Sequence, residues 1–128
     1  DGVRPLLEKE MLEKTIHVAM QEGAAITGVP VKDTVKSINK LSIIKKTVDR
    51  HNLFLIQTPQ VFKKDVIVKA YIAAYQDQYY GTDDSSLLER LGIPVKMVEG
   101  SYENIKITTP DDLMLAEIIV QKRKSHTQ

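Results

Sequence analysis

Residues 98–113 read VEGSYENIKITTPDDL, and this stretch places a strand, an isolated cation and a helix start next to one another. Residues 104–108 alternate apolar and polar side chains, which predicts a short strand with its two isoleucines on the core face. Lys106 then lies on the polar face and points away from the core. The following TTPDD, residues 108–112, is typical of a helix N-terminus, with a threonine cap and proline in the first helical position. A strand that runs directly into a helix puts Lys106 near the strand's carboxyl end, where open α/β sheets bind ligands.

The rest of the chain alternates predicted helices and strands. This order is typical of the later half of a doubly wound, mostly parallel, Rossmann-like sheet of the α/β class. In the first helix, Leu12, Ile16 and Ala19 form the predicted buried stripe. The predicted helices cover residues 5–23, 61–76, a short segment capped by Thr82 or Asp83, and 110 onward; the predicted strands cover 24–29, 53–56 and 95–98, with a turn at 58–60.

Residues 31–50 form a separate feature, which we call the arm. They carry strand-like residues around a predicted turn near Asn39, with six Lys or Arg side chains against two Asp, a net charge of +4 (six minus two). Isolated two-stranded hairpins are marginally stable, and this one has too little apolar surface to stand alone. We therefore expect a protruding β-arm that leans on a partner.

The composition excludes several kinds of site. The 128 residues are 42% hydrophobic and 27% charged, which suits a single domain over residues 1–128. The chain has no cysteine, which excludes disulfides and thiolate metal sites, and its three histidines lack ligand spacing. Asp83 and Asp84 lie at the start of a predicted helix, where acidic residues more often interact with the helix dipole than bind a metal, so no protein metal site is expected. No apolar run approaches the ~18 residues of a membrane span, and we expect a cytoplasmic protein.

Six motifs occur in order along the chain and carry a family resemblance. They resemble the 2-C-methyl-D-erythritol 4-phosphate cytidylyltransferase family, which begins with a glycine-rich loop whose arginine and lysine hold the CTP phosphates. That loop has no counterpart here, so the resemblance covers about the later half of the enzyme. The chain also starts without methionine, and we expect it to be part of a longer protein. The motifs are DGVRP (1–5), PVKDT (30–34), TVDR (47–50), QTPQVF (57–62), TDDSS (82–86) and EGSYENIKITTPDDLMLAE (99–117).

The resemblance implies a nucleotidyltransferase that moves CMP from CTP to 2-C-methyl-D-erythritol 4-phosphate and releases pyrophosphate, in non-mevalonate isoprenoid biosynthesis. It also implies Mg²⁺ bound with CTP and a homodimer in which each arm reaches into the other subunit. Such a reaction needs cations that hold two polyanions together. The resemblance implies catalytic roles for Arg50, from the partner's arm, and Lys106, and substrate binding by Asp1, Arg4, Thr34, Thr58 and Thr82.

Simpler roles and other functions compete with this hypothesis. Most lysines and arginines are merely exposed, threonines in such contexts cap helices or turns, and Asp1 and Arg4 would lie at an exposed terminus. A ribitol 5-phosphate cytidylyltransferase shares much of the pattern, although residues 104–106 and 47–50 favour the isoprenoid enzyme. A non-catalytic dimerisation module is a further alternative. Nucleic acid binding is disfavoured, because the arm has no aromatic residue for base stacking and the chain's net charge is only +1.

Overall fold

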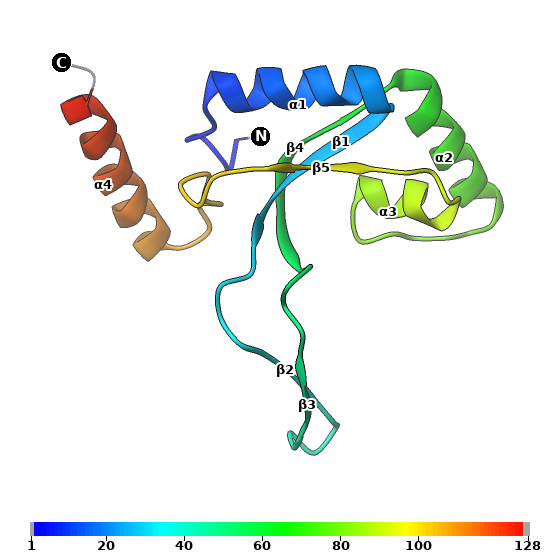
Figure 1. Cartoon of the computed structure of the whole chain (residues 1–128), viewed down its shortest axis with the longest axis horizontal. Coiled ribbons are helices and arrows are strands. Elements are labelled where there is room, and N and C mark those ends of the chain that lie inside the picture. The colour runs from blue at the N-terminus through cyan, green and yellow to red at the C-terminus, as the bar shows by residue number, and fades with distance from the viewer. Residues whose placement is uncertain (1, 127–128) are drawn as a thin grey trace.

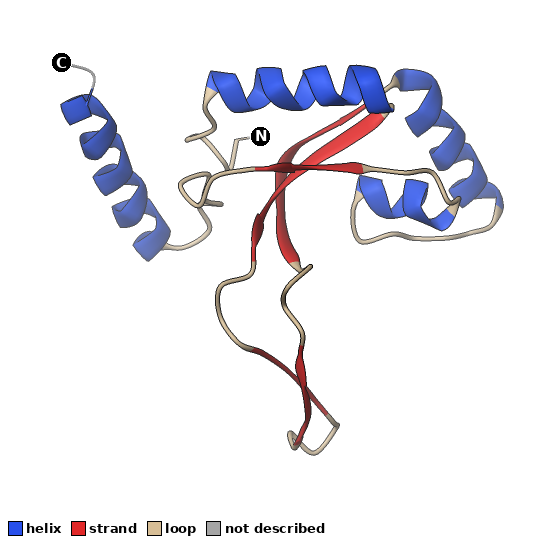
Figure 2. Cartoon of the chain, in the orientation of Figure 1, coloured by secondary structure: helices blue, strands red, loops and turns tan. Residues whose placement is uncertain are grey.

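The computed structural model describes residues 2–126 as an α/β unit with helices on a small sheet and a hairpin that projects from it (Figures 1 and 2). The α/β class and the protruding arm are confirmed. The sheet has the strand order β4-β1-β5, and the arm forms a separate two-stranded sheet, β2-β3. The elements are α1 (Lys9–Glu22), β1 (Ala24–Pro30), β2 (Val35–Ile38), β3 (Ile44–Val48), β4 (Phe54–Phe62), α2 (Lys64–Gln76), α3 (Asp84–Arg90), β5 (Lys96–Glu99) and α4 (Pro110–His126).

The sheet is mixed, with β1 in its centre. β1 runs parallel to β5, so the carboxyl ends of these two strands meet at one edge, and it runs antiparallel to β4. A register shift between Ile26 and Gly28 interrupts the β1–β4 ladder. At Gly28 a Cβ would lie 3.0 Å from both the Leu55 carbonyl oxygen and the Met97 sulfur, so a residue without a side chain lets the strands approach closely here.

Three small apolar clusters hold the helices to the rest of the chain. α2 and α3 pack on the start of β1 through Ala24, Ala70 and Leu88. Ala70 and Ala74 are the buried residues of α2. α1 packs on the sheet through a second cluster, and α4 packs on the segment before α1 through a third; their buried members are Ala19, Ala25 and Val98, and Leu6, Ala116 and Ile119.

The buried face of α1 differs from the prediction. Thr15 and Ala19 are the buried residues of the helix, whereas Leu12 and Ile16 are 38% and 40% exposed. Thr15 and Ala19 are small, so the helix backbone can lie close to the alanine-rich start of β1, and this turns the bulkier side chains outward. The helix also begins at Lys9, later than predicted.

The predicted strand at residues 104–108 and the predicted turn at 58–60 are both wrong. Residues 104–108 are extended without a strand ladder, and Ile107 N–H donates one backbone hydrogen bond to the Val3 carbonyl, at 2.7 Å. The segment 58–62 continues β4, because residues 60–62 pair with the start of β1. α2 consequently begins at Lys64 rather than at residue 61.

The arm projects away from the helices and the sheet, at the bottom of Figure 1. β2 and β3 pair antiparallel, and the Asn39 side chain closes the turn by accepting hydrogen bonds from the backbone N–H groups of Leu41 and Ile43. The arm carries more apolar surface than predicted. Its exposed apolar side chains are Ile38 (56%), Leu41 (79%), Ile43 (58%) and Ile44 (57%). Within residues 2–126, no helix combines the length and apolar character needed to cross a membrane.

Candidate active site

A turn at residues 100–104, which we call the 100–104 turn, follows β5 at the edge where β1 and β5 end. Gly100 N–H donates to the Gly28 carbonyl oxygen at 2.8 Å, and the Gln57 side-chain amide donates to the Ser101 carbonyl oxygen at 2.9 Å. A Cβ on Gly100 would lie 2.5 Å from Gln57 Oε1, so glycine is needed for this contact. The turn is therefore fastened to both β1 and β4.

Arg4 reaches this turn from the N-terminal segment. Its guanidinium donates to the Asn104 carbonyl oxygen at 2.7 Å and to the Ile56 carbonyl oxygen at 3.5 Å. Partial burial lowers the pKa of Arg4, yet a guanidinium remains charged at neutral pH. Within residues 2–126 no acidic side chain forms an ion pair with Arg4. A fixed cation with no carboxylate partner in this part of the chain is suited to binding an anion.

Thr58 and Lys106 lie on either side of the buried Asn104. The Asn104 side-chain amide donates to the Thr58 carbonyl oxygen at 2.8 Å, and the asparagine is only 2% exposed. Lys106, two residues further on, is exposed and forms no hydrogen bond or ion pair with residues 2–126. The structure thus brings two predicted site residues, Arg4 and Thr58, to one asparagine, and Lys106 follows that asparagine by two residues in the chain.

Thr82 lies close to β4. It lines a cavity of about 620 Å³ together with Ile56 of β4 and Ile26 of β1, and Ile56 is the residue whose carbonyl accepts from Arg4. Thr82 is exposed and does not cap α3. The cap is Asp83, whose carboxylate accepts from Ser86 N–H at 3.0 Å.

The acidic residues near this cavity are occupied by structural roles. Asp83 caps α3, and Asp84 accepts a short hydrogen bond from the Tyr71 hydroxyl, which raises the pKa of Tyr71. Among residues 2–126 there is no group of three His, Cys, Asp or Glu side chains placed to hold a metal ion. The described side chains therefore do not fit a protein-held Mg²⁺ site.

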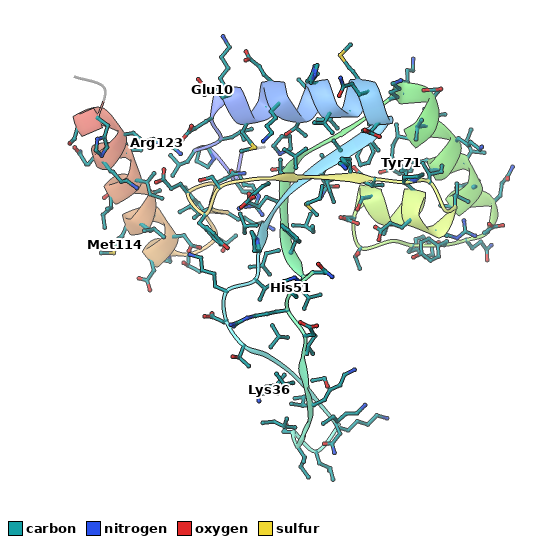
Figure 3. All side chains as sticks on the ribbon, in the orientation of Figure 1. Glu10, Lys36, His51, Tyr71, Met114 and Arg123 are labelled. Carbon is teal, nitrogen blue, oxygen red and sulfur yellow. The ribbon has the colours of Figure 1, made fainter. Side chains whose placement is uncertain are left out.

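The predicted site residues of the arm lie apart from this group. Thr34 and Arg50 are exposed, and the Arg50 guanidinium donates to the Lys32 carbonyl at the base of the arm. The Lys32 ammonium lies 3.6 Å from the centre of the Tyr102 ring, and the Tyr102 hydroxyl donates to the Pro30 carbonyl at 2.6 Å. The 100–104 turn therefore holds the base of the arm, whose junction with β4 is marked by His51 in Figure 3. Asp1 lies outside the described residues.

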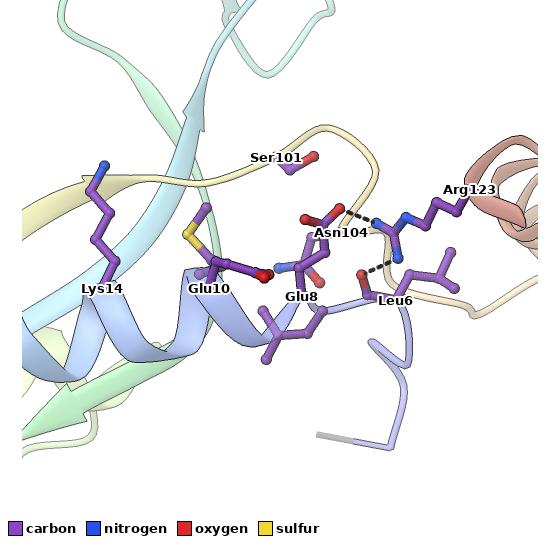
Figure 4. A pocket seen from close by; sticks show the side chains of 9 residues that line it. Leu6, Glu8, Glu10, Lys14, Ser101, Asn104 and Arg123 are labelled. Carbon is purple, nitrogen blue, oxygen red and sulfur yellow. Dashed lines mark hydrogen bonds and ion pairs between the residues drawn. The ribbon is translucent and has the colours of Figure 1, made fainter. Parts of the chain in front are cut away.

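Behind the turn, a cavity of about 200 Å³ separates α1 from α4 (Figure 4). Arg123 of α4 closes one side, with an ion pair to Glu8 at 3.1 Å and a hydrogen bond to the Leu6 carbonyl at 2.9 Å. Glu103 joins the turn to α4 through Lys122, at 2.6 Å, and this hydrogen bond lowers the pKa of Glu103. These contacts fix the turn from the side opposite Arg4.

Sequence reasoning missed the two residues that hold the site together. Gln57 was read only as part of a motif, and Asn104 was assigned to the outward face of a strand. Both are buried, at 8% and 2% exposure, and the Asn104 amide also donates to Gln57 Oε1 at 3.4 Å. An asparagine inside an otherwise alternating segment, two residues before the lysine, is the only local signal that could have drawn attention to them.

Comparison with known proteins gives one consistent result. The model of the family IspD, 2-C-methyl-D-erythritol 4-phosphate cytidylyltransferase, matches residues 1–122. The curated 2-C-methyl-D-erythritol 4-phosphate cytidylyltransferase of Syntrophus aciditrophicus is 53% identical over 124 residues, which is 97% of this chain and 53% of that protein. The one of Alkaliphilus metalliredigens is 46% identical over 100% of this chain and 53% of its own length. The chain thus spans about half the length of the curated relatives it matches.

Solved structures agree with the sequence relatives. The 4-diphosphocytidyl-2C-methyl-D-erythritol synthase of Anaerococcus prevotii has a TM-score of 0.85 and 40% identity, covering 94% of this chain and 56% of that one. The 2-C-methyl-D-erythritol 4-phosphate cytidylyltransferase of Thermus thermophilus has a TM-score of 0.82 and 33% identity, covering 93% of this chain and 58% of that one.

Proposed function

The chain belongs to the 2-C-methyl-D-erythritol 4-phosphate cytidylyltransferase family, and from this we propose that the whole protein containing residues 1–128, here called the parent protein, transfers CMP from CTP to 2-C-methyl-D-erythritol 4-phosphate. Pyrophosphate leaves, and the product serves non-mevalonate isoprenoid biosynthesis. The observation that carries the proposal is that Arg4 and Thr58 both bond to Asn104, two residues before the exposed Lys106, beside the carboxyl ends of β1 and β5. Ligands bind at such edges in α/β sheets.

The chemistry is an in-line displacement at phosphorus. A phosphate oxygen of the polyol phosphate attacks the α-phosphorus of CTP, the new P–O bond forms, and the bond to the pyrophosphate oxygen breaks. Two polyanions must approach each other, so catalysis consists mainly of positioning and charge stabilisation. In our proposal the Arg4 guanidinium, held by two carbonyls, orients the polyol phosphate, and the exposed Lys106 ammonium stabilises the charge of the reacting phosphate.

Magnesium would accompany CTP in this proposal. Residues 2–126 offer no cluster of acidic or histidine side chains for it, so its ligands would be nucleotide phosphates and groups outside these residues. We assign no reaction step to the ion.

The arm supplies the remaining residues in trans. We propose that it crosses to a second subunit and delivers Thr34 and Arg50 to that subunit's site. Two observations support this: the apolar side chains of the arm are exposed in the single chain, and within residues 2–126 the Arg50 side chain hydrogen-bonds only to the Lys32 carbonyl at the arm's own base. Because CTP and phosphorylated polyols are intracellular metabolites, we also propose that the dimer works in the cytoplasm, without a membrane or nucleic acid partner.

The test is a transfer assay on the parent protein with CTP, Mg²⁺ and 2-C-methyl-D-erythritol 4-phosphate. We expect pyrophosphate release together with a product of the mass of the cytidine diphosphate polyol, and little product from ribitol 5-phosphate. We expect no turnover by residues 1–128 alone, because the family's CTP-binding loop has no counterpart in their sequence. A parent protein that transfers no CMP to the methylerythritol phosphate contradicts the proposal.

A further inference from the structure

We infer that Asn104 is a positioning residue, which sets the polyol-phosphate side of the site: its side-chain amide ties the segment carrying Lys106 to Thr58, and its backbone carbonyl holds Arg4. The inference rests on the proposed function and adds a residue to it. Asn104 itself is buried beneath the site and would not touch the substrate.

The hydrogen bonds of Asn104 connect three separate segments. Its side-chain nitrogen donates to the Thr58 carbonyl at 2.8 Å and to Gln57 Oε1 at 3.4 Å, both on β4. Its backbone carbonyl accepts from the Arg4 guanidinium at 2.7 Å. Its backbone N–H donates to the Ser101 carbonyl at 3.0 Å, within the 100–104 turn. The Asn104 side chain therefore ties the carbonyl that accepts from Arg4 directly to β4, in addition to the Gln57 bond to Ser101.

An amide meets requirements here that other side chains of this size do not. The Thr58 carbonyl can only accept a hydrogen bond, so the nitrogen end of Asn104 must face it, and a carboxylate would place two acceptors against each other. The Gln57 amide uses its own nitrogen on Ser101, and its oxygen receives the second Asn104 proton. Gly100 leaves room for the Gln57 side chain, so Gln57, Thr58 and Asn104 form one buried polar network.

The network also affects where the backbone of Lys106 lies. Only Ile105 separates Lys106 from Asn104, and the lysine has no hydrogen bond or ion pair of its own with residues 2–126. Its backbone position is therefore set by the asparagine on one side and by the Ile107 N–H bond to Val3 on the other. Loss of the Asn104 amide should move Lys106 and Arg4 relative to Thr58, which affects polyol phosphate binding more than CTP binding.

The experiment compares Asn104→Ala and Asn104→Asp in the parent protein with a matched control, Thr15→Val. Thr15 is 0% exposed, and its hydroxyl bonds to the Met11 carbonyl inside α1, so the control also removes a buried hydrogen bond but at a distance from the site. For each variant the melting temperature, kcat and the two KM values are measured. We expect both Asn104 variants to raise KM for 2-C-methyl-D-erythritol 4-phosphate about tenfold and to lower kcat, the KM change being about 1.4 kcal/mol of binding. KM for CTP should not change.

The outcomes separate the two proposals. An inactive wild-type parent protein overturns the proposed function and this inference with it. If the wild type is active and the Asn104 variants lose stability like Thr15→Val, two results overturn the inference alone. Either both KM values stay unchanged, or both KM values rise in parallel. If the Asn104 variants do not fold, Gln57→Met decides, because it removes the bonds to Ser101 and Asn104 and leaves the Thr58 bond in place. We then expect about a threefold rise in KM for the polyol phosphate alone, and an unchanged KM overturns the inference.

Discussion

The exchange of arms between subunits can be tested by combining two inactive subunits. One carries Arg50→Ala and the other Lys106→Ala, and heterodimers of the parent protein are isolated through two different affinity tags. If Arg50 acts in the neighbouring subunit, one of the two sites carries both lesions and the other carries neither. The heterodimer should then show about half of the wild-type kcat, as expected for a symmetric dimer with independent sites.

The structure also bounds how strongly the arm can hold such a dimer. Four apolar side chains of the arm are 56–79% exposed. Their complete burial would contribute roughly 4–7 kcal/mol per arm, taking about 1.5–3 kcal/mol for each fully buried side chain. Association costs about 4–15 kcal/mol in lost translational and rotational freedom, so two arms come close to offsetting it and other contacts have to add the rest. Because the arms alone do no more than balance this cost, a heterodimer that persists at assay concentrations needs those further contacts, and it should dissociate more readily when Leu41, 79% exposed, is changed to Asp.

Two controls make the mixing experiment decisive. Differently tagged Lys106→Ala subunits combined with each other should remain inactive, which measures any wild-type contamination. Arg50→Ala combined with wild type should show about half of the activity. If the Arg50→Ala and Lys106→Ala heterodimer is as inactive as either homodimer, Arg50 acts in its own subunit and the proposed exchange of arms is refuted.

Three further predictions concern single residues. Lys106→Ala in the parent protein should lower kcat/KM about 10²–10³-fold with an unchanged melting temperature. The control Lys69→Ala, which changes an exposed lysine of α2, should leave kcat/KM and the melting temperature unchanged. A similar loss of kcat/KM in both variants in the transfer assay would remove Lys106 from the site. Leu88→Ala should lower the free energy of unfolding by about 2.7–5 kcal/mol in urea titrations, because Leu88 is 0% exposed. Leu91→Ala, at the C-cap of the same helix and 37% exposed, should cost far less, and equal costs would contradict the packing described. Hydrogen bonds from the Thr108 backbone, the Thr109 side chain and the Thr108 side chain lower the pKa of Asp112 below its usual 3.8. The contribution of Asp112 to stability is therefore present above that pH and is lost as the pH falls through the lowered pKa. The melting temperatures of wild type and Asp112→Asn should converge in acid, and a difference that persists at the lowest pH would argue against this role.

The start of α4 shows what local sequence can predict. Thr109 Oγ accepts from Asp112 N–H at 3.2 Å, and the Asp112 carboxylate accepts from Thr109 N–H at 3.1 Å. This reciprocal pair is a capping box, and it is formed by residues three apart. At the start of α3 the Asp83 carboxylate likewise accepts from Ser86 N–H at 3.0 Å, and the Ser86 hydroxyl donates to the Asp83 carbonyl at 2.6 Å. Because all partners lie within one turn, the residue types alone define these helix starts.

The face of α1 and the course of β4 could not be obtained in this way. α1 has apolar side chains on two faces, and the choice between them depends on the small residues of β1 that it packs against. Residues 58–60 contain a proline and are predicted to form a turn, yet they lie within β4, because residues 60–62 pair with residues 24–26. In both cases the deciding neighbour lies elsewhere in the sequence, and periodicity within the segment carries no information about it.

In the candidate site, too, some residues depend on neighbours in the sequence and others on distant ones. Lys106 could be identified from the alternation of residues 104–108, because its exposure depends only on its immediate neighbours. The same alternation assigned Asn104 to the exposed face, and the structure buries it, because its partners Thr58, Gln57 and Arg4 are 46, 47 and 100 residues away. The distant partners satisfy the Asn104 side-chain nitrogen, as burial of a polar group requires, whereas its Oδ1 is buried without a hydrogen-bond partner among residues 2–126. The groups that would meet the substrate are therefore accessible to local reasoning, whereas the group that orients them becomes visible only once the chain is folded.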